Sequence, residues 1–569
     1  MTLATPDKAF AGAAPVSAVP VSFENMLGWY GAGLSRRGIV LCGTLGYEQI
    51  SAGRGWRHLA ADLSAAGFPT LRFDYPGEGD SGEPNQSNVE TMVRAIKSAV
   101  RFLRVQGGVD EVVLVGLRVG ATLALLSAEE GGIDRLVLLA PFASGRAYLR
   151  EMNIRAKTID QLPDGRPFPQ DPASPVFGGF RPAAGLLASL GQVDLAKLPP
   201  APVPDVLILG ADPAGLAGRL RAGGSHVTTG PFPGLAPFLS NALISEAPTE
   251  VFAQVIAFAK QGAAAPLGAP RLPAPATPIT GPGFTETVIR FGENVGIVCA
   301  PEVPDPDKLP VLFLNSGVNP RSGYGRQTTE LARSLAALGL KSLRMDLRGV
   351  GDSGDRPDGK PPLYSADALD EARAGIDRLD EGRGVVVTGN CSGAYFGFHL
   401  LCADPRVRTA VISNLYCFDW DPNTDLSAAL KPSFRSPAAY ASMLRQKGVW
   451  QRVLRGEVKV GAIASRLISI GLGRIGQMAA KVLHPFPSAT SVAGRCAAFR
   501  KRGAKLVLIF SEGEAGIGEV AMHLGRSPAR IAKRLGHPVI LLPDTDHNMS
   551  TEGAQERMRQ IIIDAISST

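Results

Sequence analysis

The sequence is poor in cysteine for its length. Its 569 residues include six, Cys42, Cys299, Cys391, Cys402, Cys417 and Cys496. No two of them form a Cys-x-x-Cys pair, and their spacing follows no regular framework, which argues against a disulfide scaffold and against a cysteine zinc site. We therefore expect a reducing compartment, and neither a metal nor a cofactor.

Long apolar runs are also missing. No segment reaches about 18 uninterrupted apolar residues, so the sequence predicts no membrane-spanning helix. Residues 1–14 lack the charged region and apolar stretch that mark a signal peptide. The expected location is cytoplasmic.

Acidic residues are scarce in one long segment. Residues 426–502 contain 14 Lys and Arg against a single acid, Glu457, although the whole chain carries a formal net charge of only +7. The segment is either a solvated face or a surface for an anionic partner. Few aromatic residues lie between its charges, so we expect no nucleic-acid binding.

The chain contains two copies of one pattern. The strings GFPTLRFDYPGEGDSG and GLKSLRMDLRGVGDSG align with Asp74 against Asp346, 272 positions apart. A helical stretch and a short β-branched strand follow in each copy, leading to GLRVGA at Gly116 and GNCSGA at Gly389. An internal repeat of this length predicts two domains of one fold.

Apolar strands alternate with helical segments throughout both copies. This order predicts, for each copy, a mostly parallel sheet with helices on both faces, whose reactive groups gather at the carboxyl ends of the strands. The Pro, Ala and Gly content of residues 261–283 indicates a semi-rigid linker. The predicted domains are therefore residues 1–260 and 284–569, with a helical cap insertion at 419–502 in the second.

The second copy carries a strand, then Gly389-Asn390-Cys391-Ser392-Gly393, then an apolar helix. Small residues around a central nucleophile at such a turn form a nucleophile elbow. Here the sequence resembles the α/β-hydrolase superfamily over nearly its whole length, twice. The cysteine at the centre is similar to the G-x-C-x-G box of dienelactone hydrolases and polyhydroxyalkanoate synthases. The resemblance implies that Cys391 is the nucleophile.

The same resemblance implies further site residues, because the superfamily orders them nucleophile, acid, histidine. Glu514 follows a strand where the family's acid stands, with Glu512 as the alternative, and His547 follows the last strand. The oxyanion would be held by the backbone amides of Ser392, Gly317 and Val318.

The first copy lacks these groups. Arg118 occupies the centre of its elbow, and a guanidinium cannot attack a carbonyl. Asp212 stands in the acid's region, but the position expected for the histidine aligns with Ala236. We interpret this half as a pseudo-hydrolase domain.

These residues predict an acyl hydrolase that cleaves an ester or thioester through a Cys-His-Glu triad and a thioester acyl-enzyme. The alternatives are an acyltransferase that passes the acyl group to an alcohol or amine, and a non-catalytic binding scaffold. Basic residues of the cap, Arg452, Arg455 and Lys459, are candidates to meet an acyl donor linked to coenzyme A or a carrier protein. A peripheral contact with an anionic membrane is the other use of that amphipathic segment.

Overall fold

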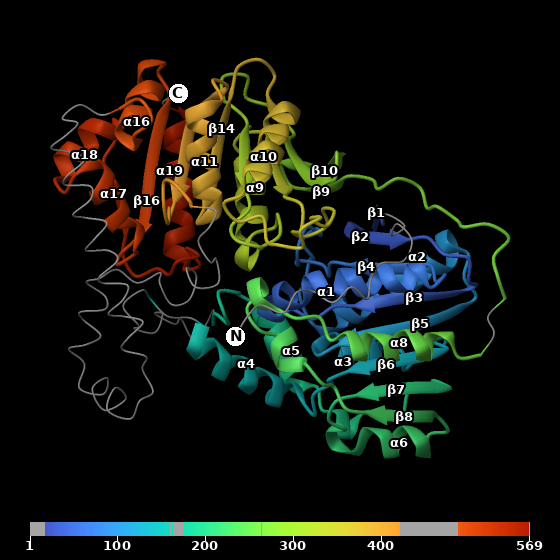
Figure 1. The fold of residues 1–569 in the computed structure, drawn as a ribbon. Coiled ribbons are helices and arrows are strands. Elements are labelled where there is room, and N and C mark those ends of the chain that lie inside the picture. The colour runs from blue at the N-terminus through green and yellow to red at the C-terminus, as the bar shows by residue number, and fades with distance from the viewer. Residues whose placement is uncertain (1–17, 160–161, 163–174, 263–264, 422–487, 568–569) are drawn as a thin grey trace, which may run out of the picture.

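The computed structural model describes residues 18–159, 162, 175–262, 265–421 and 488–567. It consists of two α/β halves, each built on its own sheet (Figure 1). Within these residues the first sheet has eight strands and the second has nine. The predicted fold class, two tandem mostly parallel sheets with helices on both faces, is confirmed.

The first sheet has the strand order β1-β2-β4-β3-β5-β6-β7-β8. β1 pairs antiparallel with β2, and β2 with β4, while β4, β3 and β5 to β8 are parallel to one another. Its strands are β1 (Val19–Phe23), β2 (Met26–Gly31), β3 (Arg37–Cys42), β4 (Thr70–Phe73), β5 (Glu111–Leu117), β6 (Arg135–Leu139), β7 (Asp205–Leu209) and β8 (His226–Gly230).

Starting from the corresponding edge, the second sheet repeats this order as β9-β10-β11-β13-β12-β14-β15-β16-β17. The edge strand β9 is the addition. The antiparallel hairpin of β10 and β11 turns between Phe291 and Asn294. The strands are β9 (Ile279–Gly281), β10 (Phe284–Phe291), β11 (Asn294–Pro301), β12 (Val311–Leu314), β13 (Ser342–Asp346), β14 (Val385–Asn390), β15 (Val407–Ser413), β16 (Lys505–Ser511) and β17 (Ile540–Leu542).

Helices cover both faces of each sheet because the central parallel strands are apolar on both sides. One face of the first sheet packs on α1 (Gly46–Ala65), α7 (Leu235–Phe238) and α8 (Thr249–Lys260), and the other on α2 (Val89–Gly107), α3 (Val119–Ser127), α4 (Gly145–Ile159), α5 (Ala184–Gln192) and α6 (Leu216–Ala222). In the second half α9 (Gln327–Ala336) and α19 (Glu552–Ser567) cover one face. The opposite face carries α10 (Ala366–Leu379), α11 (Ser392–Ala403), α16 (Val492–Lys501), α17 (Gly516–Leu524) and α18 (Pro528–Leu535).

The expected linker is partly structured. Its last residues include β9, which pairs with β10, so the second sheet begins at Ile279 rather than at residue 284. Upstream, Pro266 bridges to Ser35, and the carbonyl of Arg271 accepts a hydrogen bond from the Tyr30 hydroxyl at 3.0 Å. The connection therefore runs along the first half and is held to it.

The carboxyl-terminal part of the range expected for a cap, residues 419–502, packs in the core instead. α16 falls inside that range, yet Cys496 and Phe499 are fully buried in the core beside α11 and α18. The helix therefore belongs to the layer that covers the sheet. Residues 422–487, and with them Arg452, Arg455 and Lys459, lie outside the described residues. Among the described helices, none is both long and apolar enough to cross a membrane.

Candidate active site

The turn between β14 and α11 places Cys391 at the carboxyl end of a central strand. Cys391 has φ 56° and ψ −113°, a conformation that costs energy for any residue with a side chain. The surrounding glycines permit it: a Cβ atom on Gly393 would lie 2.8 Å from the carbonyl oxygen of Asn315. The Cys391 amide donates to the Ser413 carbonyl at 3.0 Å, which fixes the turn to the neighbouring strand.

The first half keeps the same turn without the thiol. Arg118 has φ 56° and ψ −115°, and its amide donates to the Leu139 carbonyl at 2.9 Å. Its guanidinium is buried and pairs with the fully buried Glu48 at 3.0 Å and with Glu151 at 2.6 Å. An ion-paired arginine therefore fills the space where the second half holds its thiol.

The remaining expected positions of the first half are also structural. An Asp212 carboxylate oxygen accepts the Ala217 amide at 3.0 Å, at the start of α6. Ala236 lies in the short helix α7, and His226 is exposed at the start of β8. The segment from the end of β8 through α7, residues 230–238, contains no histidine.

In the second half, a loop after β17 brings His547 to the cysteine turn. The Nδ1 atom of His547 lies 3.1 Å from a carboxylate oxygen of the buried Glu514, and its ring also interacts with Cys391. Burial opposes a charged imidazole here, but Glu514 and Cys391 outweigh it and hold the pKa of His547 well above its ordinary value. Glu512 is exposed, and its backbone amide donates to the Leu542 carbonyl. Of the two acids considered, Glu514 is the one in contact with the histidine.

The loop after β12 passes beside the cysteine turn. The Gly317 amide donates to the Ser392 hydroxyl at 2.9 Å, so that amide already has a partner. Ser392 is the first residue of α11, and its amide is one of the four that a helix leaves without an intrahelical acceptor. Val318 follows Gly317, which has φ 62°. The amides of Ser392 and Val318 are thus better candidates to hold an anion than that of Gly317.

Two amide side chains that sequence reasoning missed hold the histidine loop. Asn390 and Asn414 both donate to the carbonyl oxygen of His547, at 3.0 Å and 2.8 Å. Asn390 in turn accepts from the Ser413 hydroxyl at 2.9 Å. Asn390 stands next to the cysteine in the sequence, but nothing in the sequence links Asn414 to residue 547. The only local signal at Asn414 is an asparagine directly after an apolar strand, where it adopts φ 48°.

Tyr364 is a further residue that the sequence did not reveal. It is buried close to Cys391, and its ring stacks on Trp420 with centroids 4.6 Å apart. Tyr395, on α11, contacts the Tyr364 ring edge-on, with ring centroids 5.1 Å apart. Burial raises the pKa of the Tyr364 hydroxyl well above its ordinary value, so the hydroxyl stays protonated at neutral pH. An aromatic wall therefore stands beside the thiol.

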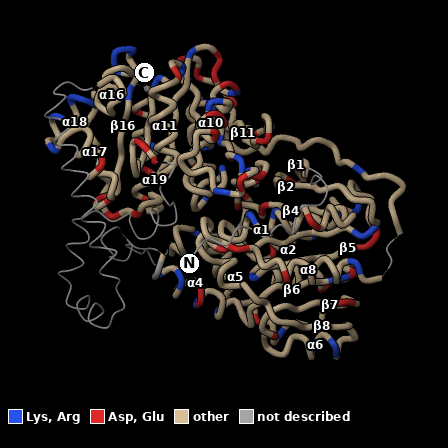
Figure 2. The backbone as a smooth tube through the Cα atoms, in the orientation of Figure 1, with Lys and Arg blue, Asp and Glu red and all other residues tan. Residues whose placement is uncertain are grey.

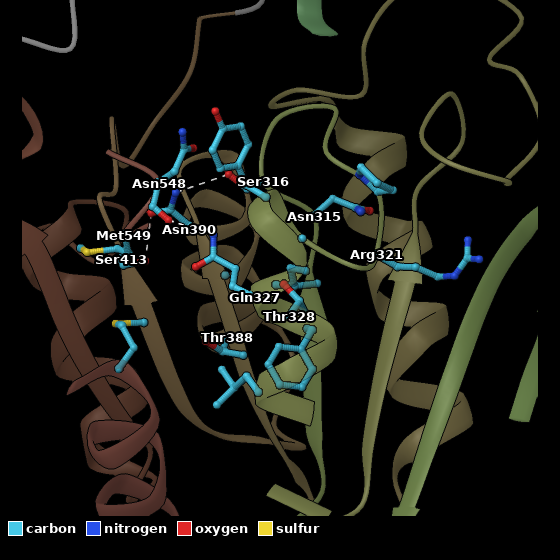
Figure 3. Close-up of a pocket in the computed structure, with 18 of the residues that line it drawn as sticks. Asn315, Ser316, Arg321, Gln327, Thr328, Thr388, Asn390, Ser413, Asn548 and Met549 are labelled. Atoms are coloured by element: carbon cyan, nitrogen blue, oxygen red, sulfur yellow. Dashed lines mark hydrogen bonds between the residues drawn. The ribbon is translucent and has the colours of Figure 1, made fainter. Parts of the chain in front are cut away.

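A cavity of about 110 Å³ lies behind these loops (Figure 3). Three of the residues that line the cavity are sequence neighbours of site residues. They are Ser316 (next to Gly317), Asn390 (next to Cys391) and Asn548 (next to His547). Figure 3 shows these three side chains gathered at the carboxyl ends of the strands, with Asn390 bonded to Ser316 at 3.4 Å. The volume is smaller than the ~300–1,000 Å³ of typical ligand pockets and is suited to a few water molecules.

Comparison with known families agrees with this architecture. Residues 311–561 match the α/β hydrolase family, and residues 50–166 match the serine aminopeptidase S33 family. This chain belongs to the α/β-hydrolase superfamily. As a member of that superfamily it is a hydrolase of the ester or amide type, with two hydrolase domains in tandem. No curated protein matches the chain.

Solved structures similar to this α/β-hydrolase are of low identity. The esterase Pf2001 of Pyrococcus furiosus is 16% identical with a TM-score of 0.30, and the comparison covers 43% of this chain and 91% of that one. A proline iminopeptidase-related protein of Thermus thermophilus is 18% identical (TM-score 0.28; 50% and 99% covered). Est1E of Butyrivibrio proteoclasticus, with ferulic acid bound, is 16% identical (TM-score 0.31; 42% and 97% covered).

Proposed function

We propose that the second half is an acyl hydrolase that cleaves an ester or thioester through Cys391, His547 and Glu514. The observation that carries this proposal is the 3.1 Å hydrogen bond between His547 and Glu514, on a ring that also interacts with Cys391 of the strained turn. A raised histidine pKa favours an imidazolium beside a thiolate, and the thiolate is the reactive form of cysteine.

The first step forms the acyl-enzyme. The Cys391 thiolate attacks the carbonyl carbon, and the amides of Ser392 and Val318 stabilise the oxyanion that develops on the carbonyl oxygen. The tetrahedral adduct then expels the alcohol or thiol, which takes the proton of the His547 imidazolium as it leaves. The result is an acyl group in thioester linkage to Cys391 and a neutral imidazole.

The second step returns the enzyme to its starting state. His547 takes one proton from a water molecule, and the resulting hydroxide attacks the acyl carbon. Collapse of the second adduct releases the carboxylic acid and restores the thiolate beside the imidazolium. The cavity beside Ser316, Asn390 and Asn548 supports this step, because it offers room for water next to the loops that flank Cys391.

Acyl transfer to an alcohol or amine is the second candidate. It is favoured by the burial of Cys391, which is 7% exposed, because a shielded acyl-enzyme survives long enough to meet another acceptor. A donor linked to coenzyme A or a carrier protein suits either reaction.

The test is mass spectrometry of the intact protein after mixing with short p-nitrophenyl esters and acyl thioesters. We expect one acyl adduct, mapped to Cys391, and none in Cys391→Ala, which should keep its fold because the turn accepts a smaller side chain. Cys402→Ala is the matched control and should acylate as the wild type does. An adduct on another residue, or turnover by Cys391→Ala, would contradict the proposal.

The same adduct separates the two candidate reactions. Loss of the acyl group in buffer alone at the rate of turnover indicates hydrolysis. Loss that requires an added alcohol or amine, with the acylated acceptor as product, indicates transfer.

A further inference from the structure

The two halves meet through a reciprocal pair of ion contacts. Arg72 of the first half pairs with Asp352 of the second, and Arg344 of the second pairs with Asp80 of the first at 3.2 Å. Arg72 and Arg344 are 272 positions apart, as are Asp80 and Asp352, which is the offset of the repeat. The duplicated turns therefore interlock across a pseudo-two-fold axis, as in an isologous dimer. Figure 2 shows Lys, Arg, Asp and Glu of both halves gathered at this junction.

Arg321 extends these contacts into the second half. Its guanidinium donates to Asp80 at 2.8 Å, to Asp346 at 2.5 Å and to Asp352 at 2.8 Å, and its side chain is almost fully buried. A planar guanidinium suits this task because its donors point in several fixed directions at once. One of the three carboxylates that hold Arg321 is therefore supplied by the first half.

From Asp346 the contacts lead to the loop beside the cysteine. Asp346 accepts the Arg321 amide at 2.6 Å and the Asn315 side-chain amide at 3.4 Å. Asn315 also donates to the Asn319 carbonyl at 3.0 Å and accepts the Leu347 amide at 2.8 Å. Its side chain thus closes the loop that contains residues 316–318.

The first half touches the histidine loop as well. Arg181 donates to the Ser550 carbonyl at 2.8 Å, and Phe180 packs on Tyr324 with ring centroids 5.4 Å apart. The Ser550 amide donates to Asp546, which precedes His547. Both loops that flank Cys391 are therefore connected to residues of the first half.

We propose that Asp80 of the pseudo-hydrolase half is a positioning residue for the loop 315–318 of the other half. It acts through Arg321 and Asp346, and the inference rests on the proposed role of that loop in holding the oxyanion. The first half is therefore part of the catalytic apparatus, although its own elbow carries no nucleophile.

Asp80→Asn in the full-length protein tests this. Arg344 keeps Glu286 at 2.7 Å and Arg321 keeps Asp346 and Asp352, so neither buried cation is left without a carboxylate and the fold should survive. We expect acylation by a p-nitrophenyl ester to slow roughly tenfold, since small displacements of catalytic groups cost large factors in rate. Alkylation by iodoacetamide should stay within about twofold of wild type, because displacement of iodide generates no oxyanion.

Glu83→Gln is the matched control. Glu83 also crosses between the halves, to Arg326 at 2.5 Å and Arg333 at 2.9 Å. Both arginines also donate to backbone carbonyls of residues 79–81, but among the described residues neither is hydrogen-bonded to Arg321, Asp346 or Asn315. Glu83→Gln should leave the rates of acylation and of alkylation by iodoacetamide unchanged. Asn315→Ala should reproduce the acylation defect, and the losses in the double variant with Asp80→Asn should not add.

The outcomes separate the two proposals. An Asp80→Asn variant that acylates at the wild-type rate overturns the positioning role, as does an equal loss in Glu83→Gln. Should Asp80→Asn not fold, Arg321→Lys gives the same test, since one ammonium cannot reproduce the fork of donors. If the wild type itself forms no adduct on Cys391, the proposed function is wrong rather than the role of Asp80.

Discussion

At the scale of single residues, the two halves differ most at two equivalent positions. Cys391 and Arg118 share a strained backbone conformation that is nearly identical in φ and ψ, yet one side chain faces a histidine and the other two carboxylates. The first half thus retains the turn because its core packing depends on it. A Cβ atom on Gly120 would lie 2.2 Å from the Cys42 carbonyl oxygen, so the close approach of helix and strand persists without the chemistry.

The prediction at the residue scale concerns Glu514 and the dependence of the acylation rate on pH. Glu514 raises the pKa of His547, and the thiolate–imidazolium pair is lost as pH rises through that pKa. Glu514→Gln removes the charge, so the pKa falls and the alkaline limb of the acylation rate should move to lower pH. Glu512→Gln changes an exposed carboxylate that is not the partner of the ring and should leave the profile in place.

Acylation rates from pH 5 to 10 for both variants provide the measurement. An unchanged alkaline limb in Glu514→Gln, or a shift only in Glu512→Gln, would mean that the orienting acid is misassigned.

At the scale of elements, the junction of β12, β14 and α11 sets the position of the thiol. α11 begins directly after Cys391, and its first residues pass close to the end of β12. Only glycine fits at 393, because the carbonyl oxygens of Leu314 and Asn315 occupy the space of any Cβ atom. The helix can therefore approach the loop 315–318 closely enough for Ser392 to bond Gly317.

Gly393→Ala should destabilise the protein by about 2 kcal/mol or more, as overpacking against backbone does, and should abolish acylation. Gly518→Ala is the control: it lies within α17 with nothing in the space of a Cβ atom, so it should stabilise the helix by roughly 0.5–1 kcal/mol. Urea unfolding and the acylation rate measure both effects. A fully active and stable Gly393→Ala variant would show that the turn tolerates more than its geometry indicates.

At the scale of the whole molecule, the tandem resembles a dimer joined into one chain. Leu27 of the first half packs with Ile279 and Ile297 of the second, in addition to the reciprocal ion pairs. Arg326, which is 9% exposed, donates to the Gly79 and Ser81 carbonyls across the same junction. Separating the halves would expose apolar side chains and remove the partners of buried charged groups, so both halves are stabilised by this interface.

Deletion of residues 1–260 should therefore leave a poorly soluble second half with slow acylation. Supplying residues 1–260 as a separate chain should recover solubility and rate if the interface reassembles. Size-exclusion chromatography and the acylation assay follow both. A soluble, monomeric and fully active truncated protein would show the first half to be dispensable.

The sequence by itself determined the features that depend on residues close together in the chain. Strand and helix periodicity, the repeated glycine-rich turn after Asp74 and Asp346, and the glycines around Cys391 are local, and they are sufficient to predict two mostly parallel α/β halves. The resemblance of these motifs to the α/β-hydrolase superfamily supplied the family. Glu514 and His547 follow strands whose order the fold fixes, so their proximity could also be predicted.

The contacts between residues far apart in the sequence were decided by the tertiary structure alone. The contact of Asp80 with Arg321, the hydrogen bond of Asn414 to the His547 carbonyl and the wall formed by Tyr364 each join residues from separate elements. The same holds for β9 within the expected linker and for α16 within the expected cap, where pairing and burial outweigh local composition. Such contacts depend on how whole layers and whole halves pack, and no periodicity or spacing in the chain encodes the relative placement of two folded units.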